Sequence, residues 1–397
     1  MKPHIRIMSS IKSALVICIM LIMSASASAQ QALGNRSKIV SPEINPDNSV
    51  TFRLIAPKAV KVEVFGDFIK FGPGMSLPEM KETDGIWEYT TEPLESELYS
   101  YAFIVDGTRI LDPSNVYINR DITTLMNIFI IGDGQGDYYK VNDVPHGNVS
   151  KVWYDSPGLD MKRRMTVYTP AGYEKNKKQK YPVFYLLHGA GGDEEAWMDL
   201  GRASQILDNL IAQGKAEPMI VVMTNGNATD MSAPGYSHDG FRVPGMNAGR
   251  MRNGAFEESF IDVVRYIESN YRVYKDKKHR AIGGLSMGGY HSLHISKYYP
   301  DMFDYIGLFS AATHLHEESD SPVYRNDKAQ IAVQFSKKPA LYWIAIGKTD
   351  FLYQDNVKYR QFLDENGYPY IYRESEDGHI WKNWRVYLTE FVPMLFK

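Results

Sequence analysis

The chain has 397 residues, of which 44% are hydrophobic and 23% charged, so it is long and apolar enough to bury a core in two domains. Its 44 basic residues nearly balance 47 acidic ones, which leaves a net charge of −3 and excludes the basic surface that binds nucleic acid. A single cysteine excludes an intrachain disulfide and a zinc site built from thiolates.

The N-terminal residues have the pattern of an export signal. Three basic residues precede an apolar run at 14–23, and a segment of small residues ending at Ala29 follows it. The run is too short to span a bilayer stably. We therefore expect residues 1–29 to be a signal peptide whose cleavage removes the lone Cys18. The mature protein is then secreted or periplasmic, with no stable membrane span.

Residues 38–135 have the pattern of an all-β domain. Apolar and polar residues alternate along five short segments that are separated by turn residues. Period-two patterning at this density predicts a β-sandwich. A linker is expected at 132–137, where three glycines fall within six residues. The expected strands are 50–54, 60–65, 86–90, 99–105 and 126–131.

Residues 145–397 have the pattern of an α/β domain. Apolar, strand-like runs alternate with helical segments, which are expected at 202–213, 256–270 and 354–366. Alternation of this kind predicts a mostly parallel sheet with helices on both faces. The expected fold class is therefore α/β, with an all-β sandwich preceding the α/β domain.

A glycine-rich loop, His188 to Gly192, follows the apolar strand expected at 182–187. Its glycines allow a backbone N–H to turn inward, and an acyl-transfer site needs such donors for the oxyanion. We expect Ala190 to supply one donor of this oxyanion hole. His188 could act as a second base, but its place at a strand end before glycine favours a structural role.

A long segment at 224–255, rich in Gly, Asn, Met and Pro, follows the strand expected at 219–223. Loops of this length inside a compact domain are usually functional or disordered. The preceding strand is expected to end at the same edge of the sheet as the nucleophile described next. We therefore expect this segment to help wall the pocket.

Ser286 stands in the sequence Gly-Leu-Ser-Met-Gly, directly after the apolar run at 281–283. Apolar residues at helical spacing follow it and stop at Pro300. A strand, a sharp turn and a helix in this order are typical of a serine nucleophile. We expect Ser286 to be the nucleophile and the N–H of Met287 to be the second oxyanion donor. The alternative is a glycine-rich turn whose serine caps the helix.

The acid and the base are expected downstream, in the order Ser, acid, His that α/β-hydrolases use. Asp350 follows a buried-strand pattern at 341–347, and His379 lies on a loop before the last helix. Asp350 would orient His379, which would take the proton of Ser286. A helix cap for Asp350 and a hydrogen-bonded loop residue for His379 are the structural alternatives. Four rival acids follow no strand as cleanly: Asp355, Glu374, Glu376 and Asp377.

These motifs resemble carbohydrate esterase family 1, in the esterase D group that includes feruloyl and acetylxylan esterases. The resemblance covers residues 145–397 and implies an α/β-hydrolase fold. It also implies that Ser286, Asp350 and His379 are the nucleophile, the acid and the base, in agreement with the assignment from the residues. The motifs that carry it are 188–192 with Trp197 shortly after, 284–289, 347–350 and 378–384.

Three tryptophans near these motifs are candidate substrate-binding residues: Trp197, Trp381 and Trp384. Indole rings could supply apolar surface to an aromatic acyl group, because flat rings pack well on one another. The structural alternative for each tryptophan is packing in the core, where large aromatic residues are mostly found. Both interpretations stay open at this point.

The all-β domain resembles carbohydrate-binding module 48, an immunoglobulin-like domain of the early-set type. The resemblance places Phe71 and Arg109 where starch-binding members have exposed tryptophans, and it places Trp87 in the core. Glycan binding and a packing or pocket-shaping role therefore remain alternatives for this domain. The motifs that carry it are 52–57, 66–68, 85–87, 101–107 and 112–113.

Together these inferences predict a secreted serine esterase that hydrolyses feruloyl esters on arabinoxylan or xylo-oligosaccharides through an acyl-enzyme. The substrate class follows from the resemblance and the export signal. An acetylxylan esterase and an enterochelin-esterase-like lactone hydrolase are the enzymatic alternatives, and a glycan-binding protein with an inactive hydrolase scaffold is the third. No cofactor is expected, and the charge balance predicts no nucleic-acid partner. No metal ion is expected either, because the histidine-containing segment at 314–318 is typical of an exposed polar loop.

Overall fold

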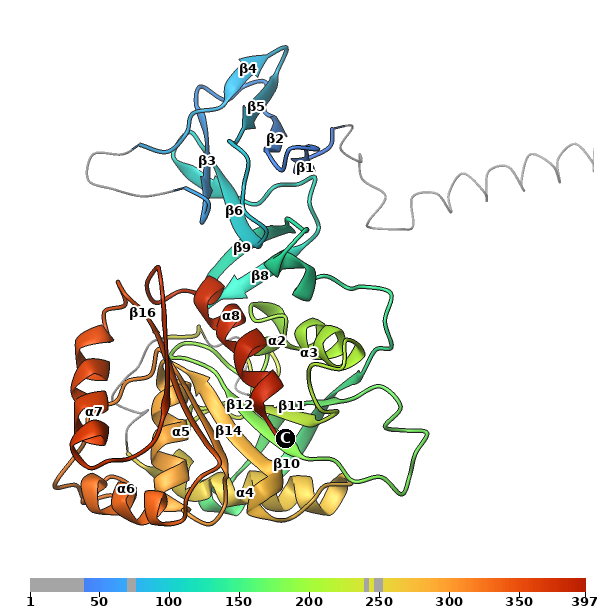
Figure 1. Cartoon of the computed structure of the whole chain (residues 1–397). Helices are drawn as coiled ribbons and strands as arrows, with labels where there is room; N and C mark the ends of the chain where they lie inside the picture. The colour runs from blue at the N-terminus through green and yellow to red at the C-terminus, as the bar shows by residue number, and fades with distance from the viewer. Residues whose placement is uncertain (1–38, 70–75, 239–242, 246–252) are drawn as a thin grey trace, which may run out of the picture.

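The chain forms an all-β domain, which lies at the top of Figure 1, and an α/β domain below it. The expected signal peptide at 1–29 and Phe71 lie outside the described part of the chain. Within the described part, no helix is both long and apolar enough to cross a membrane. The computed structural model describes residues 39–69, 76–238, 243–245 and 253–397.

The N-terminal domain is a sandwich of two antiparallel sheets. One sheet has the order β1-β2-β5-β4 and the other has the order β3-β6-β9-β8, with β7 paired to β6. All five expected strands are present, and four short strands that the alternation did not reveal join them. The strands are β1 (Glu43–Ile44), β2 (Val50–Ile55), β3 (Val62–Gly66), β4 (Lys81–Thr83), β5 (Ile86–Thr90), β6 (Leu98–Val105), β7 (Thr108–Ile110), β8 (Ile118–Asp121) and β9 (Thr124–Ile130).

Aromatic and aliphatic side chains that alternate along the strands fill the space between the two sheets. Phe52 packs against Tyr101 and Phe129, with ring centroids 4.7 and 5.7 Å apart. Trp87 is buried among them, as expected, and its indole N–H donates to the carbonyl of Ala56 at 3.0 Å. The sandwich therefore has a hydrophobic core of its own.

The C-terminal domain contains an eight-stranded sheet with the order β10-β11-β13-β12-β14-β15-β16-β17. Strands β12 to β17 run parallel, and β10 and β11 join antiparallel at one end. The carboxyl ends of the parallel strands meet at one edge, where such sheets bind their ligands. The strands are β10 (Asn148–Ser156), β11 (Met161–Thr169), β12 (Val183–Leu187), β13 (Ile220–Thr224), β14 (Arg280–Leu285), β15 (Tyr305–Phe309), β16 (Leu341–Gly347) and β17 (Ile371–Ser375).

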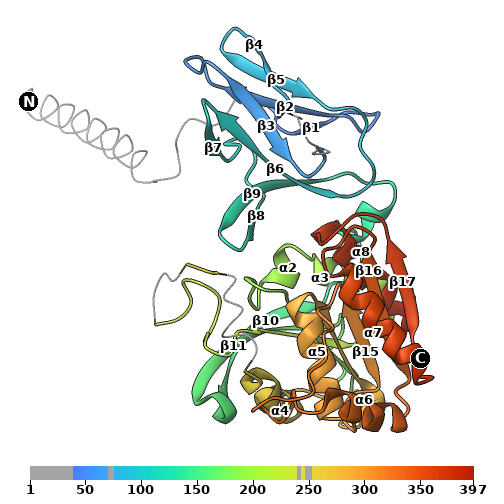
Figure 2. The same cartoon turned by 90° about the vertical axis from the view of Figure 1, so that its left-hand side faces the viewer.

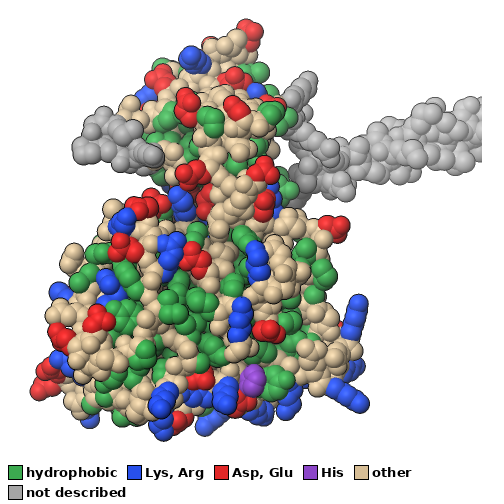
Figure 3. All heavy atoms as spheres, viewed as in Figure 1, with side chains coloured by type: hydrophobic (Ala, Val, Ile, Leu, Met, Phe, Trp, Pro, Cys, Tyr) green, Lys and Arg blue, Asp and Glu red, His purple; other side chains and the backbone are tan. Residues whose placement is uncertain are grey.

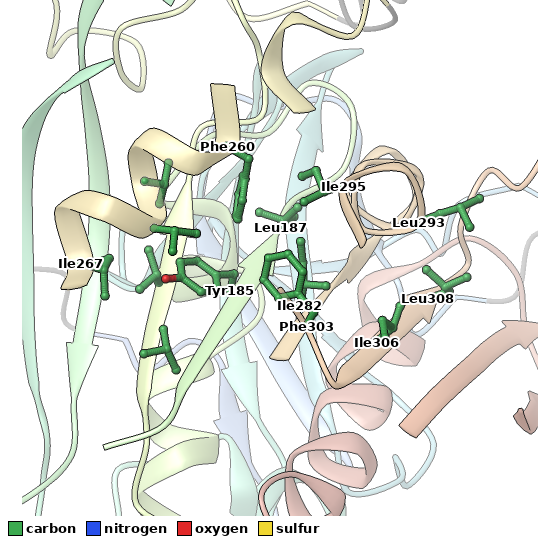
Figure 4. Close-up of a cluster of buried hydrophobic side chains, with 14 of the residues drawn as sticks. Tyr185, Leu187, Phe260, Ile267, Ile282, Leu293, Ile295, Phe303, Ile306 and Leu308 are labelled. Carbon is green, nitrogen blue, oxygen red and sulfur yellow. The ribbon is translucent and has the colours of Figure 1, made fainter. Parts of the chain in front are cut away.

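Helices cover both faces of this sheet (Figures 1 and 2). Helices α4 to α7 pack on one face, whereas α2, α3 and α8 pack on the other. Figure 4 shows Phe260 of α4 and Ile295 of α5 beside Tyr185, Leu187 and Ile282 of the strands. The three expected helices agree with α3, α4 and α7 within one residue at each end. The helices are α2 (Ala196–Asp199), α3 (Ala203–Ala212), α4 (Ala255–Asn270), α5 (Met287–Tyr298), α6 (Asp327–Ser336), α7 (Tyr353–Glu365) and α8 (Trp381–Phe391).

A buried ion pair joins the two domains. Arg385 of α8 lies 2.9 Å from Glu97, the residue before β6, and both side chains are buried. The guanidinium also donates to the carbonyls of Leu98 and Leu200. Burial raises the pKa of Glu97, and the charge of Arg385 opposes that rise. At the surface, charged side chains of both signs surround the junction (Figure 3).

Replacing Arg385 with methionine should lower the free energy of unfolding by about 3–5 kcal/mol, because it leaves the Glu97 carboxylate buried without its partner. Urea denaturation measures this loss. The double variant Arg385→Met/Glu97→Gln removes both charges and should recover most of the lost stability. If the double variant loses as much unfolding free energy as the two single variants lose together, Arg385 and Glu97 are not energetically coupled.

Candidate active site

Ser286 occupies a strained turn between β14 and α5. Its φ of 52° and ψ of −113° form a combination that residues with a side chain rarely adopt. A Cβ on Gly284 or Gly288 would lie 2.5 or 2.3 Å from the carbonyl oxygen of Leu187, so neither flanking position accepts a side chain. The turn thus holds Ser286 at the carboxyl edge of the sheet, where it lines a cavity.

Asp350 and His379 meet at the same edge. Asp350 is buried in the turn after β16, and its Oδ2 lies 2.8 Å from Nδ1 of His379. Its Oδ1 accepts the N–H of Leu352 at 2.9 Å, so the carboxylate also orders the backbone ahead of α7. With Nδ1 directed at the carboxylate, Nε2 is the ring nitrogen left to accept the proton of Ser286. The structure therefore brings the three expected residues into one site.

The four rival acids make contacts elsewhere. Asp377 is half-exposed and pairs with Lys382, with 3.1 Å between Oδ2 and Nζ. Glu376 pairs with a lysine, and Glu374 accepts the hydroxyls of two tyrosines. Asp355 lies 3.6 Å from the lysine one helical turn away. None of these recorded contacts is with the histidine that Asp350 orients.

Ser286 and His379 line one cavity of about 240 Å³. Ala190, an expected oxyanion donor, lines the same cavity. Met287 is the first residue of α5, where the backbone N–H groups have no partner within the helix. An oxyanion formed on a substrate at Ser286 would lie beside the positive end of this helix. The arrangement can carry out acyl transfer to a serine nucleophile.

His188 fixes the glycine-rich loop in place. Its Nε2 accepts the N–H of Gly226, and its Nδ1 lies near the carbonyl oxygen of Gly189, each at 2.7 Å. Because an N–H only donates and a carbonyl only accepts, the ring is neutral with its proton on Nδ1. Burial lowers the pKa of His188 to about 4, which keeps the ring neutral near pH 7. His188 therefore has a structural role.

A hairpin of the N-terminal domain completes the cavity wall. Arg120, Asp121 and Ile122 line the cavity at the turn between β8 and β9. Arg120 pairs with buried Asp193, which lies 73 positions later in the chain. A Cβ on Gly191 would lie 2.8 Å from Cγ1 of Ile122, so the hairpin rests directly on the loop that holds the oxyanion donor. Sequence analysis missed this contact, because β8 is too short for its alternation to be recognised.

The three candidate tryptophans form a series of edge-to-face contacts that ends at the histidine. Ring centroids lie 5.3 Å apart for Trp197 and Trp381, 5.2 Å for Trp381 and Trp384, and 4.9 Å for Trp384 and His379. Trp381 and Trp384 line the cavity. Trp197 is 1% exposed, and its indole N–H donates to the carbonyl of Leu187 at 2.9 Å. For Trp197 the core-packing alternative therefore replaces the expected substrate contact.

Phe351 is a cavity residue that sequence analysis missed. It directly follows Asp350, and its ring centroid lies 4.4 Å from that of His379. Its side chain is 74% exposed, so its ring offers apolar surface at the rim of the cavity. An aromatic residue next to the expected acid was the signal that could have revealed it.

None of the described residues of the segment at 224–255 lines the cavity. The buried guanidinium of Arg163 donates to the carbonyls of Asn225 and Asn227, both at 2.7 Å. The start of the segment thus braces the backbone against which His188 is held. The remainder lies outside the described ranges, and for it the expected pocket-walling role stays a prediction.

His294, His316 and Asp327 are the group in the described ranges that could offer ligands to a metal ion, since one ligand atom from each lies within 4.8 Å of the others. Lys297 already pairs with Asp327, with 2.7 Å between Nζ and Oδ1, and an added cation would meet this ammonium at close range. We therefore assign no metal site here. The segment at 314–318 differs from the exposed loop expected, because its histidines are half-buried.

Comparison with protein families identifies both parts of the chain. The Esterase family matches residues 156–395, and carbohydrate-binding module 48 (isoamylase N-terminal domain) matches residues 40–119. The second match covers most of the sandwich, and the first contains Ser286, Asp350 and His379.

Two curated relatives come from bacteria. An endo-1,4-beta-xylanase/feruloyl esterase of Xylanibacter ruminicola is 33% identical over 286 residues, which are 71% of this chain and 37% of that protein. Endo-1,4-beta-xylanase Y of Acetivibrio thermocellus is 26% identical over 221 residues, or 52% of this chain and 18% of that protein. The chain thus spans little more than a third of the first relative and less than a fifth of the second.

Two solved structures are similar in fold. A ferulic acid esterase of Anaeromyces mucronatus in complex with ferulic acid is 25% identical, with a TM-score of 0.53 over 65% of this chain and 93% of the other. The enterobactin esterase of Shigella flexneri is 14% identical, with a TM-score of 0.59 over 87% of this chain and 92% of the other. The second likeness concerns the fold alone.

Proposed function

Because the chain belongs to the Esterase family and carries a carbohydrate-binding module 48 domain ahead of its α/β-hydrolase domain, we propose that it is an exported serine esterase that releases feruloyl groups from arabinoxylan. Carboxylic ester hydrolysis is the activity of this family. The observation that carries the proposal is that Ser286 and His379 line one cavity with aromatic walls, while buried Asp350 contacts Nδ1 of His379.

In the proposed reaction, Ser286 attacks the ester carbonyl while His379 takes its proton and Asp350 stabilises the resulting imidazolium. The N–H groups of Ala190 and Met287 hold the oxyanion. His379 then returns the proton to the sugar oxygen as the ester bond breaks, which leaves the acyl group on the serine. Water, deprotonated by His379, hydrolyses this acyl-enzyme and restores the serine hydroxyl.

Aromatic side chains beside His379 support an aromatic acyl group. Trp381 and Phe351 line the cavity with flat apolar surfaces that fit a feruloyl ring, and buried Trp384 packs edge-to-face on His379. One curated relative is named a xylanase/feruloyl esterase, and a solved structure similar in fold holds ferulic acid. The basic, apolar and small-residue pattern at 1–29 supports export.

Methyl ferulate should exceed methyl acetate in kcat/KM by about 70-fold beyond the difference in their intrinsic reactivity. Burial of about 100 Å² of the feruloyl ring at roughly 25 cal/mol per Å² gives on the order of 2.5 kcal/mol, if the contact persists in the transition state. Trp381→Ala should remove most of this preference, and methyl acetate turnover of the same variant is the internal control. Equal corrected rates on both esters in the wild type would contradict an aromatic acyl site.

Release assays on three further esters test the proposed substrate against its alternatives. Feruloylated arabinoxylan should release ferulate faster than acetylated xylan releases acetate at equal ester concentration. Faster acetate release would favour an acetylxylan esterase instead. Cleavage of enterobactin with the highest kcat/KM would identify a lactone hydrolase and overturn the arabinoxylan proposal.

A further inference from the structure

Trp153 stands apart from the other tryptophans of the chain. All six lie in the described ranges, and the other five are buried or half-buried. The Trp153 side chain is 44% exposed on β10, the end strand of the large sheet. Single exposed apolar residues are common and need no function. Exposure alone therefore gives Trp153 no function, and a role in substrate binding depends on where Trp153 lies relative to the active site.

Trp153 lies at the catalytic edge of the sheet. In the strand register it is opposite Arg164 of β11, and the next residue, Met165, is opposite Thr224, the last residue of β13. Strand β13 ends at the same edge as β14, which Ser286 follows. Four strand intervals of about 4.8 Å separate β10 from β14, or about 19 Å in all. A polysaccharide chain can span this distance, whereas a methyl ester cannot.

Charged side chains next to Trp153 connect this part of β10 with the cavity. Lys151 lies two residues before Trp153, so both side chains are on one face of β10, and Lys151 pairs with Glu195, which lines the cavity. Arg164, opposite Trp153, also pairs with Glu195, at 2.6 Å. Its guanidinium lies 3.9 Å from the ring centroid of Tyr236. These three charged groups and the rings of Trp153 and Tyr236 thus form one set of neighbouring residues beside the cavity.

The second ring of this set is both exposed and supported from below. Tyr236 is 61% exposed, and it stacks on the buried guanidinium of Arg164. A ring held from one side loses little conformational freedom when a ligand covers its other side. Sugar rings have apolar C–H faces and hydroxyl edges, so they combine stacking on such rings with hydrogen bonds to nearby charged groups.

In the N-terminal domain, the resemblance to carbohydrate-binding module 48 marks two positions for sugar-stacking tryptophans. Arg109 stands at one such position; it is exposed, with its guanidinium 4.9 Å from the ring centroid of Phe65. The other position, Phe71, lies outside the described residues. The described one of these two positions therefore presents a guanidinium in place of an aromatic ring.

We propose that Trp153 and Tyr236 form a sugar-stacking subsite that holds the xylan backbone while its feruloyl group occupies the cavity at Ser286. This inference rests on the proposed function for the nature of the substrate. The subsite determines specificity for polymeric over small esters, because only a polymeric leaving group reaches it. It takes no part in the chemistry at the ester bond.

The test compares Trp153→Ala with the matched control Tyr274→Ala on two substrates. Tyr274 is 37% exposed but precedes the amino end of β14, at the opposite edge of the sheet. Trp153→Ala should lower kcat/KM on feruloylated arabinoxylan by about tenfold and change kcat/KM on methyl ferulate less than twofold. A tenfold loss corresponds to about 1.4 kcal/mol of binding. The control should change neither value. Equal losses on both substrates, or no loss on the polymer, would overturn the subsite.

Binding without turnover separates the subsite from the proposed function. The Ser286→Ala variant should be retarded in a native gel that contains arabinoxylan without feruloyl groups. The double variant Ser286→Ala/Trp153→Ala should migrate without retardation. If the double variant loses the retardation but the wild type hydrolyses no feruloyl ester, the subsite is supported and the proposed function is overturned. If the single and the double variant are equally retarded and the wild type hydrolyses methyl ferulate, the subsite is overturned and the proposed function stands.

Discussion

Ser286→Ala should lower kcat on methyl ferulate by several orders of magnitude, on the order of the 10⁶-fold loss that follows removal of the nucleophile in a serine protease. The loss is this large because, among the described residues that line the cavity, only Ser286 carries a hydroxyl. The fold should survive, because the N–H of Ser286 still donates to the carbonyl of Phe309 at 2.9 Å and the alanine keeps the Cβ. Steady-state kinetics and circular dichroism measure the two effects.

A fluorophosphonate probe provides the direct readout of this assignment. It should label the wild type and not Ser286→Ala. Ser292→Ala is the matched control, because Ser292 lies on α5, the helix that follows Ser286, and its hydroxyl donates to the carbonyl of Gly288 at 2.7 Å. The control protein should be labelled like the wild type. Labelling of folded Ser286→Ala would remove the nucleophile from the mechanism.

Asp350→Asn should lower kcat/KM by about 10⁴-fold, the loss seen when the triad aspartate of a serine protease becomes asparagine. The amide keeps the size of the side chain but no longer favours the proton on Nδ1 of His379, so Nε2 is less available to accept the proton of Ser286. Kinetics with methyl ferulate at several pH values measure the loss.

Asp377→Asn is the matched control for this variant. Asp377 lies two residues before His379 but pairs with Lys382 at the surface, so its loss should change kcat/KM by much less. If Asp377→Asn were the more damaging of the two, the acid would have to be reassigned. Equal and small effects of both variants would leave His379 without a carboxylate partner that matters for catalysis.

The docking of the N-terminal domain changes what that domain contributes. The family to which it is similar is known as a carbohydrate-binding module, but here its β8–β9 hairpin places Ile122 on the loop beside Ala190. The buried pair of Arg385 and Glu97 holds the two domains in this arrangement. The pocket-shaping alternative therefore has direct geometric support, and loss of the hairpin would open one side of the cavity.

The amino-acid sequence by itself determined the fold class and most of the expected triad geometry. Local rules sufficed for these features. Alternation predicted five sandwich strands, and helical periodicity placed α3, α4 and α7 within one residue. The glycines that flank Ser286 indicate a turn too crowded for side chains. The loop of Ala190 and Asp350 each follow the end of a parallel strand, so both lie at one edge of the sheet.

Only the tertiary structure decided which residues surround the cavity, because these contacts join elements that are distant in the chain and leave no local pattern. It separated Trp197, sealed in the core, from Trp381, which lines the cavity, although both are tryptophans next to family motifs. It added Phe351 and Ile122 to the cavity wall and left Trp153 exposed at the catalytic edge. Burial of a side chain depends on what packs over it, and that is set by the docking of whole elements rather than by sequence neighbours.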